Sequence, residues 1–135
     1  MKILLDTHTI IWTLTGDERL GRTNEERILD TANSIYFSVV SLWEIALKNA
    51  KAPDKCPYDE RVVYEQCIES GLELLGLSQE HVFALRTLRT KAGRTIANMD
   101  PFDRILIAQA KSERMRILSA DTNFKNYDEK CILAI

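Results

Sequence analysis

Met1-Lys-Ile-Leu-Leu-Asp6 is a short apolar strand that ends in an acid. Residues 3–5 are apolar without alternation, which is typical of a strand buried on both faces of a parallel sheet. Residues 10–14 then carry apolar side chains at helical spacing, so the strand passes into a helix almost at once. This stretch predicts an α/β fold, with Asp6 at the point where strand and helix meet.

The rest of the chain repeats this alternation of short apolar strands with helical segments. Strand-like runs occupy residues 2–5, 35–40, 72–75, 117–118 and 131–133. Helical spacing of apolar residues covers residues 10–14, 42–49, 58–70, 78–89 and 103–116. Strands that alternate with helices imply a parallel sheet covered on both faces. We therefore predict an α/β sandwich with an extra helical pair between residues 41 and 70.

Length and composition predict one ordinary globular domain over residues 1–135. Hydrophobic residues make up 45% and charged residues 28% of the chain, which argues against a disordered or fibrous protein. No apolar run approaches the roughly 18–20 residues that span a bilayer, and the N-terminal apolar stretch is too short for a secretory signal. We therefore expect a cytoplasmic protein. The three cysteines lack a Cys-x-x-Cys pattern, which argues against a disulfide framework and a structural zinc site.

The balance of charge gives no overall attraction to nucleic acid. Lys and Arg number 18 against 20 Asp and Glu, which leaves a formal net charge of −2. One local exception, which we name the basic strip, holds four cations and no acid: Arg86, Arg89, Lys91 and Arg94. The basic strip is either a solvated surface or a set of contacts to RNA phosphates.

Four acids stand where predicted strands pass into helices. Asp6 and Asp121 each follow an apolar strand, Glu44 lies one helical turn after a third strand, and Asp103 lies in the first turn of a helix. In an open parallel sheet, ligands bind beyond the carboxyl ends of the strands. We therefore expect these four acids to converge on one edge of the sheet.

Each acid also has a purely structural explanation when it is taken alone. Asp6 is a candidate helix N-cap, and Ser41-Leu-Trp-Glu44 matches a capping box. Asp100-Pro-Phe-Asp103 reads as an N-cap, a proline at the first helical position and an acid favoured by the helix dipole. Asp121-Thr-Asn123 is typical of a turn. These alternatives stay open at each position.

The joint pattern indicates a metal site. Carboxylates crowded on one edge repel one another by several kcal/mol unless a cation lies among them. Hard oxygen ligands without His or Cys suit Mg²⁺ or Mn²⁺ and disfavour zinc. One or two such ions can activate a water and hold a scissile phosphate, so the pattern favours phosphodiester hydrolysis.

Other candidate sites are weaker. His8 and His81 are single histidines in separate predicted helices, where we expect structural roles. The sequence contains no Gly-rich phosphate loop and no Ser-His-acid pattern. Trp12 and Trp43 lie in apolar helical stretches, which favours core or dimer contacts over stacking platforms for bases.

Around the four acids the sequence resembles the PIN-domain family, and within it the toxin ribonucleases of VapBC toxin–antitoxin pairs. Four stretches carry the resemblance, in the order of the family and across nearly the whole chain. They are Leu4-Leu-Asp-Thr-His-Thr-Ile-Ile-Trp12, Ser38-Val-Val-Ser-Leu-Trp-Glu-Ile-Ala-Leu-Lys48, Asp100-Pro-Phe-Asp-Arg-Ile-Leu-Ile-Ala-Gln-Ala110 and Leu118-Ser-Ala-Asp-Thr-Asn-Phe124.

The resemblance implies a PIN-like three-layer α/β/α sandwich around a short parallel sheet of four to five strands. It implies an endoribonuclease that depends on Mg²⁺ or Mn²⁺, with one or two ions held by the residues that match the family's metal-binding acids. It also implies a homodimer, and a small VapB-like antitoxin whose C-terminal segment blocks the acidic pocket. The matching acids are Asp6, Glu44, Asp103 and Asp121.

Further roles accompany the resemblance. Asp100 competes with Asp121 for the place of the fourth metal ligand, and Arg104 is a phosphate contact or a salt-bridge partner. We expect Thr7 to donate a hydrogen bond to a metal ligand. Residues 94–99 depart from the Pro-rich, His-bearing segment of many such relatives, which bears on substrate choice and antitoxin fit.

The sequence therefore predicts a cytoplasmic toxin endoribonuclease that cleaves tRNA or rRNA through its acidic cluster. Two alternatives remain open. One is a metal-dependent phosphatase that acts on small phosphate esters through the same acids. The other is a non-catalytic RNA- or protein-binding module in which the acids serve only as caps.

Overall fold

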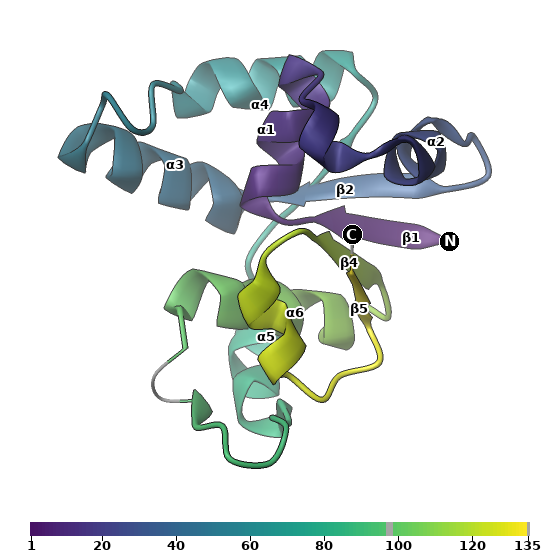
Figure 1. The fold of residues 1–135 in the computed structure, drawn as a ribbon, viewed down its shortest axis with the longest axis vertical. Coiled ribbons are helices and arrows are strands. Elements are labelled where there is room, and N and C mark those ends of the chain that lie inside the picture. The colour runs from purple at the N-terminus through teal and green to yellow at the C-terminus, as the bar shows by residue number, and fades with distance from the viewer. Residues whose placement is uncertain (97–98, 135) are drawn as a thin grey trace.

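A computed structural model describes residues 1–96 and 99–134 of the chain. Ala97 and Asn98, which belong to the segment that departs from the family pattern, lie outside this description. The strands form one sheet in the order β3-β2-β1-β4-β5, and all neighbouring strands run parallel (Figure 1). The predicted parallel sheet is thus confirmed, with five strands. Their bounds are β1 (Lys2–Leu5), β2 (Ser34–Ser38), β3 (Glu73–Leu75), β4 (Arg116–Ser119) and β5 (Ile132–Ala134).

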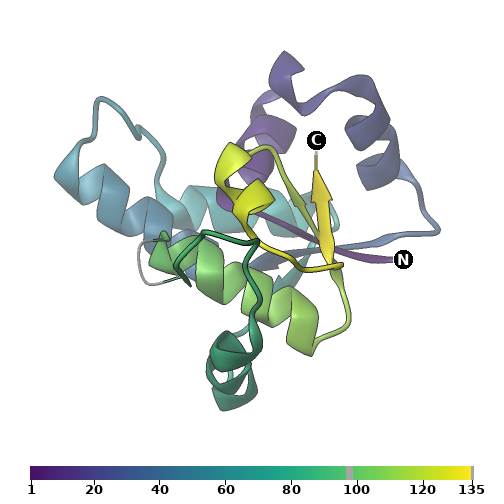
Figure 2. The same ribbon diagram turned by 60° about the horizontal axis from the view of Figure 1, so that its bottom comes forward.

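Helices cover both faces of the sheet, as predicted. One layer contains α1 (Thr7–Thr15), α2 (Arg22–Leu29), α3 (Val39–Lys51) and α4 (Glu60–Glu69), and the other contains α5 (Gln79–Ala84) and α6 (Pro101–Ser112) (Figures 1 and 2). Short 3-10 helices complete the two layers: η1 (Glu18–Leu20), η2 (Leu85–Thr87) and η4 (Thr122–Asn126). None of the described helices is both long and apolar enough to cross a membrane.

The first strand is buried on both faces, as its unbroken apolar run predicts. Ile3 and Leu5 belong to the core on the side of α1, α3 and α4, whereas Leu4 belongs to the core on the side of α6. Successive side chains of a strand point to opposite faces, so β1 supplies both hydrophobic layers. This central strand therefore fixes the sheet between its two helical layers.

The predicted extra helical pair is α3 and α4, which pack against each other. Two boundaries differ from the sequence prediction. The strand expected over 35–40 ends at Ser38, because the Ser38 hydroxyl accepts a hydrogen bond from the Val40 N–H (3.0 Å) and caps α3 there. The helix expected over 78–89 divides into α5 and η2. The sequence pattern missed α2, whose only apolar residues, Ile28 and Leu29, are adjacent and show no helical period.

The carboxyl ends of three central strands meet at one edge of the sheet. Leu5 of β1 is paired with Phe37 of β2 and with Leu118 of β4. The next residue along each strand, Asp6 or Ser119, therefore lies at the same edge, and the Asp6 N–H donates to the Leu118 carbonyl (3.2 Å). The predicted convergence of strand ends is present in the fold.

Candidate functional site

Asp6 is at once the N-cap of α1 and a buried acid at the sheet edge, with 3% of its surface exposed. Its Oδ1 accepts a hydrogen bond from the Thr9 N–H (2.9 Å), and its Oδ2 accepts one from the Ser119 hydroxyl (2.5 Å). Burial raises the pKa of this carboxyl, although the hydrogen bonds from Ser119 and Thr9 oppose the rise. The cap and the site are compatible roles for one side chain.

Glu44 is held by side chains from two helices, and the capping-box alternative for it is wrong. Because α3 begins at Val39 with Ser38 as its N-cap, Ser41 lies inside the helix and cannot cap it. Glu44 is instead 5% exposed and accepts a hydrogen bond from the Thr7 hydroxyl of α1 through Oε1 (2.7 Å). Its Oε2 pairs with the Lys48 ammonium (2.5 Å).

The pKa of Asp103 gives the most direct evidence that the acids lie close together. Asp103 is half-buried in the first turn of α6, and its pKa is raised to about 8. Burial is the largest cause, and the negative charges of four other carboxylates add to it. These carboxylates belong to Asp100, Asp121, Glu44 and Asp6, in order of decreasing effect. All the predicted acids therefore act on one point of the sheet edge.

Asp100 and Asp121 are caps, as their local sequences predict. Asp100 caps α6, with Pro101 at the first helical position, and its Oδ1 accepts from the N–H groups of Phe102 (2.8 Å) and Asp103 (3.1 Å). Asp121 caps η4, and its Oδ1 accepts from a backbone N–H two residues later (2.8 Å). Both caps use Oδ1, so they do not exclude a further role for Oδ2.

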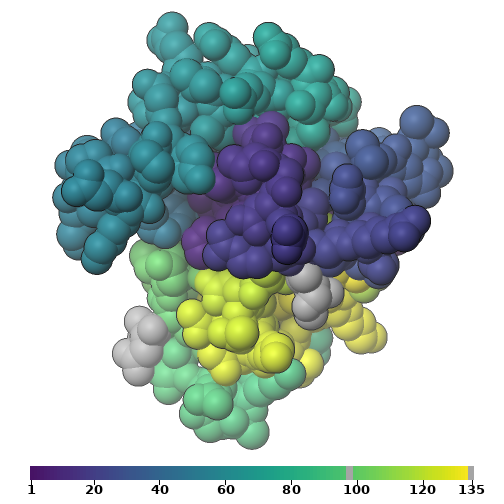
Figure 3. All heavy atoms as spheres, turned by 45° about the horizontal axis from the view of Figure 1, so that its top comes forward, coloured from purple at the N-terminus to yellow at the C-terminus, as the bar shows by residue number. Residues whose placement is uncertain are grey.

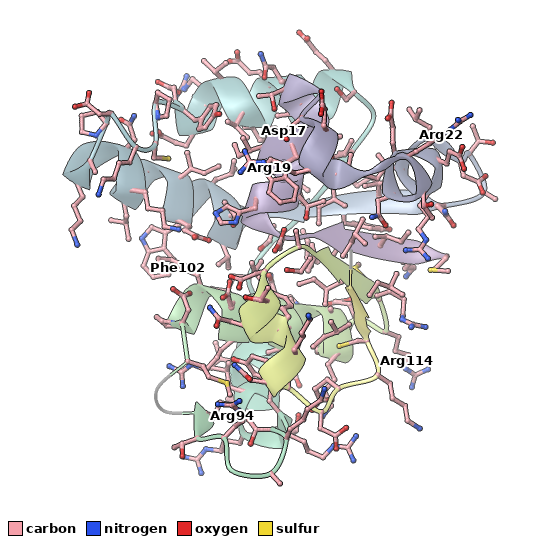
Figure 4. All side chains as sticks on the ribbon, viewed as in Figure 1. Asp17, Arg19, Arg22, Arg94, Phe102 and Arg114 are labelled. Atoms are coloured by element: carbon pink, nitrogen blue, oxygen red, sulfur yellow. The ribbon has the colours of Figure 1, made fainter. Side chains whose placement is uncertain are left out.

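An aromatic contact holds α3 and α6 together beside the acids. Trp43, which precedes Glu44, packs edge to face against Phe102, which precedes Asp103, with ring centroids 5.0 Å apart. Figure 4 shows Phe102 at the start of α6, between the two helical layers. Trp43 is 55% exposed, which excludes the core and leaves the dimer contact as the remaining prediction for it.

Lys48 supplies the countercharge of the acidic edge. Its burial lowers the pKa of the ammonium, but the hydrogen bond and charge of Glu44, then the charges of Asp100 and Asp103, raise that pKa above its ordinary value. Sequence reasoning missed Lys48, although its position one helical turn after Glu44 was a usable signal. The ammonium and the Thr7 hydroxyl together occupy both oxygens of Glu44.

The oxygen ligands suit a hard cation, but their side chains are not arranged around a common metal position. In residues 1–96 and 99–134, no group of three or more His, Cys, Asp or Glu side chains is placed to hold a metal ion. Lys48 pairs with Glu44, while Thr9 and Ser119 donate hydrogen bonds to Asp6. The oxygens of Asp103, crowded by like charges, have the chemistry that Mg²⁺ or Mn²⁺ prefers. Lys48 competes with such an ion for Glu44.

The residues of the basic strip are all exposed, on η2 and the loop that follows it. The strip has an acidic neighbour that the local sequence does not show, because the Arg89 N–H donates to Glu129 Oε2 (2.7 Å). Figure 4 places Arg94 at the opposite end of the view from Arg19 of η1. No hydrogen bond or ion pair of the described chain joins the strip to the acidic edge.

Arg104 and Tyr127 present buried polar atoms toward the same edge. Neither Arg104 Nε nor the Tyr127 hydroxyl has a hydrogen-bond partner in the part of the chain that the structure describes. Burial raises the pKa of Tyr127, and the charge of Asp103 raises it further, against the effect of Arg104. Sequence reasoning missed Tyr127, since nothing in its local pattern distinguishes it from a core aromatic residue.

Ser119→Ala is expected to lower the free energy of unfolding by about 1–2 kcal/mol, because it leaves two buried polar groups without a partner. The Ser119 hydroxyl donates to Asp6 and accepts from the Asp121 N–H (2.9 Å). Urea denaturation measures the change, with the exposed Ser112→Ala as the matched control. Equal stability of the two variants would show that Ser119 does not hold the edge together.

Comparison with known proteins gives one family and several similar structures. The family model for the PIN domain matches residues 3–130. VapBC2 of Rickettsia felis, bound to a DNA fragment from its promoter, is similar with a TM-score of 0.71 and 18% identity, covering 99% of this chain and 98% of the other. DNA-bound VapBC of Salmonella typhimurium has a TM-score of 0.67 and 21% identity, with coverage of 99% and 98%.

A third similar structure is VapC20 of Mycobacterium tuberculosis, a toxin that cleaves the sarcin–ricin loop. It has a TM-score of 0.57 and 15% identity, and it covers 90% of this chain and 92% of the other. No curated protein matches the sequence. At these levels of identity the structures show a common fold.

Proposed function

The chain belongs to the PIN-domain family, and we propose that it is a metal-dependent endoribonuclease that acts as the toxin of a toxin–antitoxin pair. One observation carries the proposal: the pKa of Asp103 is raised to about 8, in part by four carboxylates from other positions. Crowded carboxylates repel one another at neutral pH and oppose folding, so they do not stabilise a packed core. They do create the negative charge that binds a divalent cation.

The acids would supply the metal ligands, and two hydroxyl groups would hold them in place. Asp6, Glu44 and Asp103 would hold one or two Mg²⁺ or Mn²⁺ ions, with Asp121 or Asp100 as the further ligand. When bound, the metal polarises the scissile phosphate and lowers the pKa of an attacking water. Ser119 and Thr7 fix the orientation of two ligands through the hydrogen bonds described above, as supporting residues of metal sites commonly do.

Cationic side chains would place the RNA strand. Lys48, once displaced from Glu44, lies within reach of a phosphate at the same edge. Arg104 is partly exposed, and its guanidinium would contact a phosphate. The basic strip, Arg86, Arg89, Lys91 and Arg94, would track phosphates farther along the strand.

The similar structures support the choice of partner and substrate. Two of them are VapBC complexes and one is a toxin that cleaves the sarcin–ricin loop. By analogy, the partner of this chain would be a VapB-like antitoxin that covers the acidic pocket, and the substrate would be tRNA or rRNA. A cytoplasmic homodimer completes the proposal.

Incubation with total tRNA and rRNA plus Mg²⁺ or Mn²⁺ tests the activity. The wild type is expected to cleave RNA, and Asp6→Asn to cleave it about 10³-fold more slowly, because a lost metal ligand removes several kcal/mol of transition-state stabilisation. Glu65→Gln, which removes the same charge from an exposed position on α4, is the matched control. Equal cleavage by all three proteins would rule out the metal-nuclease mechanism.

Two other outcomes point to the alternatives. Rapid hydrolysis of p-nitrophenyl phosphate with intact RNA would identify a phosphatase. RNA binding without cleavage, unchanged in Asp6→Asn, would identify a binding module in which the acids are caps.

A further inference from the structure

A cavity of about 430 Å³ lies beside the acidic edge, between α1, η1, α3 and the loop after α3. One wall carries His8, Trp12 and Arg19, and the other carries a row of lysines at positions 48, 51 and 55. Figure 3 shows the atoms of α1 in purple, between the blue-green atoms of α3 and the yellow atoms of the C-terminal part. The two walls differ in chemistry, because one is mainly aromatic and the other is cationic.

The cavity is continuous with the acidic edge. Thr7 and Lys48 line it, and both also contact the carboxylate of Glu44. A ligand in the cavity therefore lies next to the acids that would hold the metal.

The lysine wall carries positive charge that the protein does not neutralise. Arg19 is paired with Asp17 (2.7 Å), and Lys48 is paired with Glu44. No carboxylate of residues 1–96 or 99–134 lies within ion-pair distance of Lys51 or Lys55. Lys51 and Lys55 therefore remain available to contact an anionic ligand in the cavity.

The opposite wall carries two aromatic rings and a guanidinium group. The imidazole of His8 and the indole of Trp12 are nearly parallel, with an interplanar angle of 18° and centroids 6.2 Å apart. The guanidinium carbon of Arg19 lies 4.8 Å from the centroid of the Trp12 ring, and Asp17 fixes its orientation (Figure 4). Trp12 thus lines a cavity, whereas the sequence favoured a core or dimer contact for it.

We propose that this cavity is a nucleotide subsite, which receives one residue of the RNA strand next to the scissile phosphate. The base lies against the wall of His8 and Trp12, and the neighbouring phosphate faces Lys51 and Lys55. Its volume falls in the range of about 300–1,000 Å³ that ligand pockets show. Base stacking on aromatic side chains and phosphate contact with lysines are the usual elements of single-strand recognition.

An acidic peptide is the competing ligand, because its carboxylates also suit lysines. The aromatic wall favours RNA, since a planar base stacks on the rings of His8 and Trp12, whereas a carboxylate does not. The Arg19 guanidinium, which would suit a carboxylate, is already paired with Asp17. Continuity with the acidic edge also favours RNA, because the subsite then extends the binding path of a phosphodiester strand. This inference rests on the proposed ribonuclease function and names a position at which the substrate binds.

Binding of a short 2′-O-methyl RNA oligonucleotide in EDTA tests the subsite without turnover, because EDTA removes the divalent metal that the proposed attack by water needs. Lys51→Gln/Lys55→Gln is expected to bind it at least tenfold more weakly, by fluorescence anisotropy. The slope of log affinity against log salt is negative, and its magnitude is expected to decrease by about 1.4, because each lost phosphate contact removes about 0.7. Both lysines are exposed, so the substitutions do not disturb the core.

The matched control is Lys2→Gln/Arg116→Gln, which removes two exposed cations at the opposite, amino ends of β1 and β4.

A second measurement tests the aromatic wall. In a Trp43→Phe background Trp12 is the sole tryptophan, and RNA is expected to quench its fluorescence. His8→Ala is expected to weaken RNA binding in the same background.

Wild-type affinity and salt slope in the lysine double variant would overturn the subsite. So would tight binding of a hexaglutamate peptide that depends on these lysines while RNA binding does not, because that result assigns the cavity to a protein ligand. Failure of the wild type to cleave RNA would contradict the proposed function alone. Binding of the uncleaved oligonucleotide is measured independently of that result.

Discussion

Asp103→Asn is expected to lower RNA cleavage by about 10³-fold while it stabilises the metal-free protein at pH 8. The loss of activity follows from the role of Asp103 as a metal ligand, since several kcal/mol of transition-state stabilisation correspond to about three powers of ten in rate. The gain in stability follows from electrostatics. Asn is close to Asp in shape but does not ionise, so it removes the repulsion from the surrounding carboxylates.

The pH dependence of this gain has a definite sign. The pKa of Asp103 is about 8 in the folded protein, against 3.8 for an unperturbed Asp. Between these pH values the folded state binds more protons than the unfolded chain, so its stability falls as pH rises from about 4 to 8. In Asp103→Asn this contribution is absent. The variant is therefore expected to gain more stability at pH 8 than at pH 5.

The size of the gain is limited by solvent. The full difference in proton affinity corresponds to more than about 5 kcal/mol, but screening of this half-buried carboxyl reduces the expected gain to about 1–2 kcal/mol. Urea denaturation in EDTA at the two pH values measures it, with Glu65→Gln as the control for loss of one charge. A variant less stable than the wild type at pH 8 would contradict the crowding, and retained cleavage would contradict the catalytic role.

The acidic cluster could be predicted because its geometry follows from a rule of parallel sheets. Asp6 and Asp121 follow buried apolar strands, and such strands deliver their carboxyl ends to one edge whatever the details of packing. The order of strands matters only in bringing β1 next to β4, and hydrophobic burial on both faces of β1 places it at the centre. Local patterns were therefore sufficient for these positions.

The supports of the cluster could not be predicted, because they depend on contacts between distant residues. Ser119 reaches Asp6 across 113 positions in the sequence, and Thr7 reaches Glu44 across 37. The capping-box pattern at Glu44 misled for a related reason. The start of α3 is set by the Ser38 hydroxyl, four residues before the apolar pattern of the helix becomes clear. Hydrophobic periodicity carries no information on either kind of polar contact.

The cavity beside the edge was also hidden from the sequence. Its walls come from α1 and α3, which are separated by a strand and two helices along the chain. The basic strip was visible because its cations lie close together in a stretch without an acid, whereas the stretch that holds the cavity lysines includes Asp54. These lysines become significant only when His8 and Trp12 face them, so the cavity had to come from the structure.

Removal of divalent metal is expected to lower RNA cleavage by about 10³-fold, and Mn²⁺ is expected to restore it. The same ion should stabilise the folded protein, because a ligand at 100 times its Kd adds about 2.7 kcal/mol. For a domain of this size that corresponds to a rise in Tm of roughly 8 °C. Asp103→Asn should show little of this rise, since it lacks one proposed ligand.

Lys48→Met separates metal binding from a general effect of ionic strength. In the wild type the Lys48 ammonium already neutralises Glu44, so it competes with an incoming ion. The variant lacks that competitor and leaves the acids without a countercharge, so its Tm should rise more with Mn²⁺ than that of the wild type. KCl at equal ionic strength is the control. Full cleavage in EDTA, with no rise in Tm for the wild type or for Lys48→Met, would show that the acidic edge works without a metal.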